Sequence, residues 1–123
     1  MEVSDFRGRE PALCETHRVL DRIADKWSLY TITVLSTGTR RFTELKREVT
    51  GISQRMLTAT LRGLERDGIV TRTVHPVIPP HVDYELTPLG HTLVDAVKNL
   101  MAWSEEHMDE IALAREDYDS RES

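Results

Sequence analysis

The spacing of apolar residues predicts two helices near the start of the chain. Apolar residues recur at intervals typical of an amphipathic helix that ends near Lys26: Leu13, Val19, Leu20 and Ile23. A more apolar helix begins at Trp27 and is stopped by the Thr37-Gly38-Thr39 turn. Arg40-Arg41-Phe42 is then predicted to be a short extended link.

Two further helices, separated by a turn that contains glycine, are predicted next. Thr43 is a suitable N-cap for a short charged helix that Gly51 ends. Ser53 is expected to cap the following helix, which Gly68 ends and whose inward face is Leu57, Leu61 and Leu64. The result is a helix-turn-helix.

The apolar period changes to two after Gly68. Ile69, Val70 and Val74 predict one strand, and Val82, Tyr84 and Leu86 predict a returning strand. The segment 76–80 between them holds three prolines, which lack the backbone donor that a sheet ladder needs. The two strands therefore form a wing with a loop at its tip.

A long terminal helix is predicted from Leu89 to about Ala114, after the start signal Thr87-Pro88. At 1.5 Å per residue it is roughly 40 Å long, more than a domain of this size covers. Its apolar stripe is also wider than one packed face requires, so part of it should bury against something else: Leu93, Val94, Val97, Leu100, Met101, Trp103, Met108 and Ile111.

The predicted fold class is mainly α (α+β), a winged helix-turn-helix with a two-stranded β-wing and a long C-terminal dimerisation helix. We expect a flexible arm over 1–12, one domain over 13–114, and a charged flexible tail over 115–123. A chain of 123 residues is too short for separate cofactor and substrate lobes. The sequence has neither an apolar run of bilayer length nor an export signal, and its single cysteine favours a reducing, cytoplasmic setting.

Charge is distributed unevenly along the chain. The net charge is -5, yet residues 40–75 hold eight Arg and Lys against four Asp and Glu. Residues 76–123 hold eleven acids against three bases. This split suggests a basic working face on an acidic protein, with solvated arginines paired to neighbouring acids as the alternative.

The helix after Ser53 carries donors on the face opposite its leucines, as a helix that reads the major groove of double-stranded DNA does. Arginine pairs with guanine and glutamine with adenine. The base-contact candidates are Gln54, Arg55, Thr58 and Arg62. Phosphate and wing contacts are expected from helix N-termini, basic side chains and the wing: Thr43, Ser53, Arg40, Arg41, Lys46, Arg72, His75 and His81.

Catalysis, cofactors and metals are not expected. The five histidines are predicted to be scattered over separate elements, and no His-x3-His or Cys-x2-Cys spacing occurs. The sequence has no glycine-rich phosphate loop and no Gly-x-Ser-x-Gly. We therefore predict no enzyme, no cofactor and no metal site.

Two stretches together resemble the HxlR family of bacterial, MarR-like transcriptional regulators. They are the Ile-Ser-x-x-Met-Leu-Thr stretch at 52–58 and the Val-x-Tyr-x-Leu-Thr-x-Leu-Gly stretch at 82–90. Flanking runs, including Lys26-Trp27, extend the resemblance over about 13–110. The family often has Cys-Pro and Gly-Gly where this chain has Cys14-Glu15 and Ala24-Asp25.

The interpretation is a homodimeric, sequence-specific DNA-binding regulator that recognises a pseudo-palindromic operator. The first and last helices should form the dimer, through Leu20, Trp27, Val97, Leu100, Met101 and Trp103. The resemblance implies that Cys14 senses oxidants, whereas a small buried side chain is the plainer alternative. A small-molecule effector stays open, as does a winged-helix protein-interaction module without DNA binding.

Overall fold

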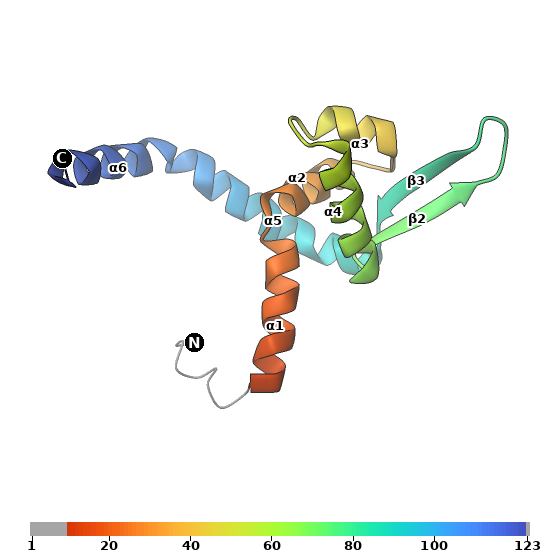
Figure 1. Ribbon diagram of the computed structural model, residues 1–123, viewed down its shortest axis with the longest axis horizontal. Helices are drawn as coiled ribbons and strands as arrows, with labels where there is room; N and C mark the ends of the chain where they lie inside the picture. Colours follow the sequence, from red (N-terminus) through yellow and green to blue (C-terminus); the bar gives the residue numbers. More distant parts are fainter. Residues whose placement is uncertain (1–9, 123) are drawn as a thin grey trace.

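The computed structural model describes the backbone over residues 10–122 and the side chains over residues 16–122. Figure 1 shows a small body from which a β-wing and two helical arms project. The elements in chain order are α1 (Glu10–Ile23), α2 (Lys26–Leu35), β1 (Arg40–Arg41), α3 (Phe42–Glu48), α4 (Gln54–Arg66), β2 (Val70–His75), β3 (His81–Leu86), α5 (Pro88–Glu106) and α6 (Met108–Glu122).

The core lies where α2, α3, α4 and the N-terminal half of α5 meet the base of the sheet. The three leucines that α4 was predicted to turn inward, Leu57, Leu61 and Leu64, are buried, so this prediction is confirmed. Ile32 and Leu45 meet them from α2 and α3. Burying each such side chain contributes about 1.5–3 kcal/mol, and this packing fixes how α4 is presented.

Side-chain caps start two of the helices where the sequence placed them. The Ser53 hydroxyl accepts a hydrogen bond from the Met56 N–H at 3.0 Å, and the Thr87 hydroxyl accepts one from the Gly90 N–H at 2.9 Å. The predicted cap at Thr43 is wrong, because α3 already begins at Phe42. There the Glu44 carboxylate accepts from the Arg41 backbone N–H at 2.8 Å.

The sheet has three strands in the order β1-β3-β2, not two. The wing hairpin pairs β2 with β3 antiparallel, from Val70 opposite Leu86 to His75 opposite His81. The predicted extended link forms a third strand, because Arg40 and Arg41 pair with Tyr84 and Asp83 along the outer edge of β3. This pairing ties the segment before α3 to the wing.

The terminal helix begins where it was predicted but does not continue as one helix. The single helix to Ala114 is instead two helices: α5 ends at Glu106, His107 has a non-helical backbone, and α6 continues to Glu122. The first helix also ends at Ile23, before Lys26. Within residues 10–122, no helix has the length and apolarity to cross a bilayer.

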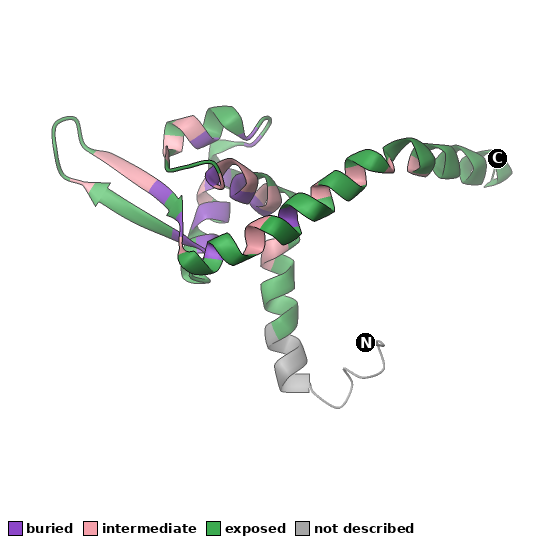
Figure 2. Ribbon diagram, turned by 180° about the vertical axis from the view of Figure 1, so that it is seen from behind, coloured by how far each residue is buried: buried purple, intermediate pink, exposed green. Residues whose placement is uncertain are grey.

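The two helical arms, α1 and α6, are largely exposed to solvent. Figure 2 shows α6 and most of the described part of α1 coloured as exposed. No residue in the described part of α6 is buried, and the side chains from Thr16 to Asp21 on α1 are all exposed. Much of the apolar surface of the molecule lies here and on the outer half of α5.

Candidate nucleic-acid interface

Helix α4 presents its polar face to solvent. Gln54, Arg55 and Arg62 are exposed and Thr58 is half-buried, on the side of the helix opposite its buried leucines. Ala59 is also exposed between them. A ridge of small side chains flanked by long donors can enter the major groove without steric obstruction.

The wing and α4 enclose a shallow cleft of about 310 Å³ between them. Arg62 and Thr58 line it from α4, and Arg72 and Tyr84 line it from the wing. Arg62 and Arg72 therefore lie on the same side of the molecule, facing the same cleft. Glu65 also lines this cleft, so the two arginines are not its only charges.

The sheet register separates the three wing residues that the sequence grouped together. Directly paired residues of antiparallel strands point to the same face and successive residues to opposite faces. Arg72 pairs with Tyr84 on the face toward α4, whereas the His75–His81 pair lies on the other face. His75 there approaches the Asp83 carboxylate, with Nε2 and Oδ2 2.8 Å apart.

Two of the histidines lie on separate strands, as expected, but the hairpin brings them into contact. His75 and His81 are cross-strand neighbours with stacked rings whose centroids are 4.6 Å apart. Sequence spacing conceals this contact because the loop 76–80 lies between them. The hairpin register would have revealed it, since paired residues come within reach of each other.

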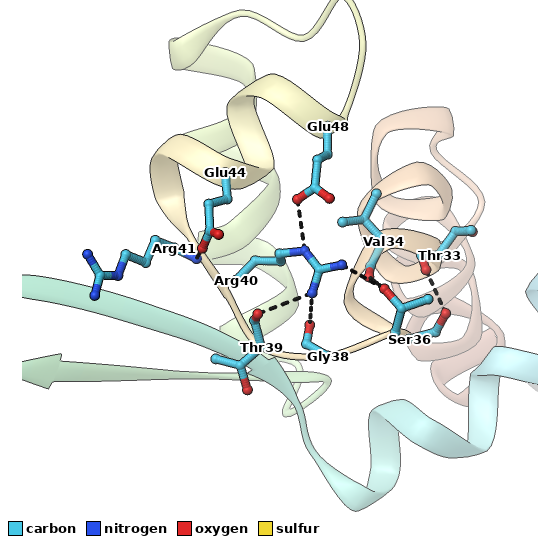
Figure 3. Close-up of polar contacts among 10 residues, drawn as sticks. Thr33, Val34, Ser36, Gly38, Thr39, Arg40, Arg41, Glu44 and Glu48 are labelled. Atoms are coloured by element: carbon cyan, nitrogen blue, oxygen red, sulfur yellow. Dashed lines mark hydrogen bonds and ion pairs between the residues drawn. The ribbon is translucent and has the colours of Figure 1, made fainter.

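The two adjacent arginines of β1 have different roles in the structure. Figure 3 shows the Arg40 guanidinium turned into the loop between α2 and α3, whereas the Arg41 side chain extends away from it. Arg40 Nε donates to Glu48 Oε2 at 2.8 Å, and its Nη atoms donate to three oxygens of that loop, on Thr37, Gly38 and Thr39. Arg40 therefore holds the start of the helix-turn-helix together. Thr43 and Lys46 are exposed on α3, which packs on α4, and Arg41 is exposed on β1, on the same face of the sheet as Asp83.

The sequence of these helices and strands matches the model of a known protein family. The family model of the HxlR-like helix-turn-helix matches residues 22–112, which include α2 to α5 and the wing. The chain belongs to the HxlR family.

Relatives within this family are regulators by name. The chain is 38% identical over 104 residues to the uncharacterised HTH-type transcriptional regulator YtfH of Escherichia coli, covering 85% of this chain and 82% of the relative. Among solved structures, the putative transcriptional regulator ytfH from Salmonella typhimurium is 39% identical, with a TM-score of 0.77 over 82% of this chain and 90% of that one. The redox regulator HypR in its reduced form is 40% identical, with a TM-score of 0.72 over 80% of this chain and 97% of that one.

The six dimer residues predicted for this HxlR chain divide into two groups. Leu20, Leu100 and Trp103 are each about half exposed, at 54%, 50% and 52%. Val97 is buried, and Trp27 and Met101 pack against the same core. Met101 also accepts a hydrogen bond from the Thr33 hydroxyl at its sulfur. Val97, Trp27 and Met101 therefore stabilise the protomer itself, because α5 packs on α2.

Two sensing predictions remain without a structural test. The Cys14 side chain lies outside the side chains that the structure describes, and its role stays a prediction. For an effector, the described residues do form an open cleft of about 390 Å³ between α2, α3 and α5. Its lining is mostly apolar with one carboxylate: Tyr30, Thr33, Val34, Glu48, Val49, Thr50 and Met101.

Proposed function

We propose that this HxlR chain is a transcriptional regulator that binds double-stranded DNA in a sequence-specific manner, as a homodimer, on a pseudo-palindromic operator. The observation that carries the proposal is the polar face of α4. Its four side chains are held outward by a buried leucine face, and the family gives the helix its context.

Base contacts in this proposal come from the first turns of α4. Arg55 is exposed there, and an arginine can donate two hydrogen bonds to guanine O6 and N7. Gln54 beside it can pair with adenine N6 and N7, while Thr58 and Arg62 follow along the same face. These four residues would carry the sequence preference.

Phosphate contacts in this proposal come from Arg41, Lys46, Thr43, Ser53 and Arg72. Arg72 lines the cleft between α4 and the wing, Lys46 is exposed on α3, which packs on α4, and Arg41 is exposed on β1 next to the start of α3. Such contacts supply salt-dependent affinity without reading the sequence. Arg40 is left out, because its guanidinium is already hydrogen-bonded within the protein. His75 and His81 are left out because they lie at the tip of the wing on its face away from α4, whereas Arg41 on that face adjoins the start of α3.

The test is selection of bound fragments from random double-stranded DNA, followed by titration of the best fragment at several salt concentrations. Arg55→Ala is expected to cost about 1–3 kcal/mol on the selected fragment and to relax its sequence preference. Arg41→Ala should instead weaken binding evenly on all fragments and lower the salt slope by about one.

The matched control is Arg115→Ala, which removes the same charge from an exposed position on α6. It should leave the sequence preference and the salt slope unchanged. If no fragment is enriched and binding disappears near physiological salt, the proposal fails. The alternative would then be a protein-interaction module that docks through the acidic C-terminal half of the chain.

A response to oxidants is the second part of the proposal. It is supported by the 40% identity to HypR, which is named a redox regulator, and by a single cysteine, Cys14, in the N-terminal half of α1. A thiolate beside a positive charge is stabilised and reacts readily with oxidants, and Arg18 follows Cys14 by one turn along α1. We expect a mild oxidant such as diamide to change the affinity for the selected fragment, and Cys14→Ser to abolish the change. An unchanged response in that variant would contradict the proposal.

A further inference from the structure

Three side chains that commonly bind metals meet on the face of the wing that turns away from α4. One ligand atom each from His75, His81 and Asp83 lies within 4.8 Å of the other two. Asp83 Oδ2 is 2.8 Å from His75 Nε2 and 3.9 Å from His81 Nε2. The two imidazole rings are stacked with 22° between their planes.

The backbone holds these residues together. His75 and His81 are the last paired residues of the β2–β3 ladder before the loop 76–80. Asp83 follows two residues later on the same strand face, and Arg41 of β1 pairs with it from the other side. Because β3 is paired on both edges at Asp83, the positions of all three Cα atoms are fixed without any cation.

We propose that His75, His81 and Asp83 bind a divalent transition-metal ion of the Zn²⁺ type. Two imidazoles and one carboxylate are a common ligand set for such ions, with water in the fourth position. Zn–N and Zn–O distances of about 2.0–2.2 Å put neighbouring ligand atoms about 3.4 Å apart in a tetrahedron. The two contacts to Asp83, at 2.8 and 3.9 Å, lie on either side of this value.

The surroundings suit a cation with one carboxylate ligand. His75 and Asp83 line an open cleft of about 240 Å³ together with Thr39, Thr73 and Glu85, which leaves room for coordinated water. Glu85 and Arg41 flank Asp83 on the same face, so their opposite charges offset each other. The three ligand side chains are partly shielded, with exposed fractions of 40%, 24% and 26% for His75, His81 and Asp83.

A bound ion would join the two strands at the place where the hairpin opens into its loop. Val77 and Ile78 in that loop are exposed, and the pairing of His75 with His81 is the last ladder contact before them. Coordination would clamp the tip of the wing and add positive charge to it. This inference stands independently of the proposed DNA binding.

The test uses the full-length chain without an affinity tag, in a Cys14→Ser background so that no thiolate can bind the metal. Zn²⁺ titration by calorimetry should give one ion per chain, and Co²⁺ should give visible absorption bands of a tetrahedral or five-coordinate site. The imidazole C–H signals of His75 and His81 should shift with Zn²⁺ in NMR spectra. His75→Ala, His81→Ala and Asp83→Asn should each weaken binding by about tenfold or more.

His91→Ala is the matched control, because His91 is exposed on α5 and is not one of the three residues whose ligand atoms lie close together. It should change the affinity by less than about twofold, the effect of a residue outside both ligand shells. Circular dichroism of each variant without metal should match that of the parent chain. The proposal is overturned if the His75→Ala/His81→Ala double variant still binds one ion with the parent affinity, or if the parent chain binds none at micromolar metal. The three residues would then be only a hydrogen-bonded cluster.

Discussion

Gly90 sits where the first turn of α5 rests on the backbone between α4 and β2. A Cβ atom built at this position would collide with the Ile69 carbonyl oxygen and lie 3.1 Å from the Leu86 side chain. The Thr87 hydroxyl and backbone N–H bind the same Ile69 carbonyl at 3.2 and 3.0 Å. The backbone therefore has little freedom to move away, and only glycine fits here without displacement.

We predict that Gly90→Ala destabilises the protein by about 1–3 kcal/mol, because overpacking against backbone outweighs the gain of up to about 1 kcal/mol in helix propensity. Gly63→Ala is the matched control in α4. The three atoms nearest to a Cβ there all belong to the guanidinium of Arg22, the far end of a flexible side chain rather than backbone. Urea denaturation at one protein concentration should show a clear loss for Gly90→Ala and a change near zero for Gly63→Ala. Equal effects would contradict this account.

The neighbours Arg40 and Arg41 illustrate what cannot be predicted at the residue scale. Both were predicted to contact phosphate, and both lie in the same basic pair. The strand pairing turns them to opposite faces of the sheet, and only Arg40 comes within reach of Glu48. The difference arises from where Glu48 and the Thr37–Thr39 turn lie in space, which residue type alone does not reveal.

At the scale of elements, local signals located the helix-turn-helix well. The caps of α4 and α5 were correct because a cap hydroxyl and its partner N–H are only three residues apart. The break between α5 and α6 was missed because the apolar repeat continues through it without Pro or Gly. At the break, the backbone N–H and the ring Nδ1 of His107 both approach the Trp103 carbonyl, at 3.1 and 2.9 Å.

Strand β1 was not predicted from the sequence either, because it forms through a non-local contact. Two arginines in succession have no strand pattern, and they become a strand only because the outer edge of β3 offers unpaired backbone groups. The candidate interface depends on this, since β1 positions both the start of α3 and the Arg41 side chain. The sequence predicted that the polar face of α4 turns outward, but it did not predict how the basic residues around that face are divided between the two sides of the sheet.

At the scale of the whole molecule, the two helical arms point to a second copy. Isolated helices of this length are marginal in water, and here α1, the outer half of α5 and α6 leave large apolar side chains exposed. Among them are Val19, Leu20, Leu100, Trp103, Met108, Leu113 and Tyr118. A homodimer that binds two half-sites of a pseudo-palindrome needs its two α4 helices about 34–36 Å apart, one turn of DNA.

We predict that the chain sediments as a dimer at micromolar concentration, and that Leu20→Glu and Leu100→Glu each weaken the dimer by about tenfold or more, which is about 1.4 kcal/mol. A charge buried in an apolar interface without a partner is the physical reason. Val77→Glu is the control, because Val77 in the wing loop is as exposed as Leu20, at 54% for both. A monomeric parent chain, or dissociation by Val77→Glu as well, would contradict this prediction.

The sequence by itself determined the helix-turn-helix, the caps of α4 and α5, the wing hairpin and the outward face of α4. These depend on hydrogen bonds over a few residues and on the period with which apolar side chains repeat. Only the tertiary structure decided the third strand, the burial of Val97, the internal role of Arg40 and the meeting of His75, His81 and Asp83. Each of these depends on which backbone edges and side chains come together from distant parts of the chain, and this is settled when the core packs and the strand register is set.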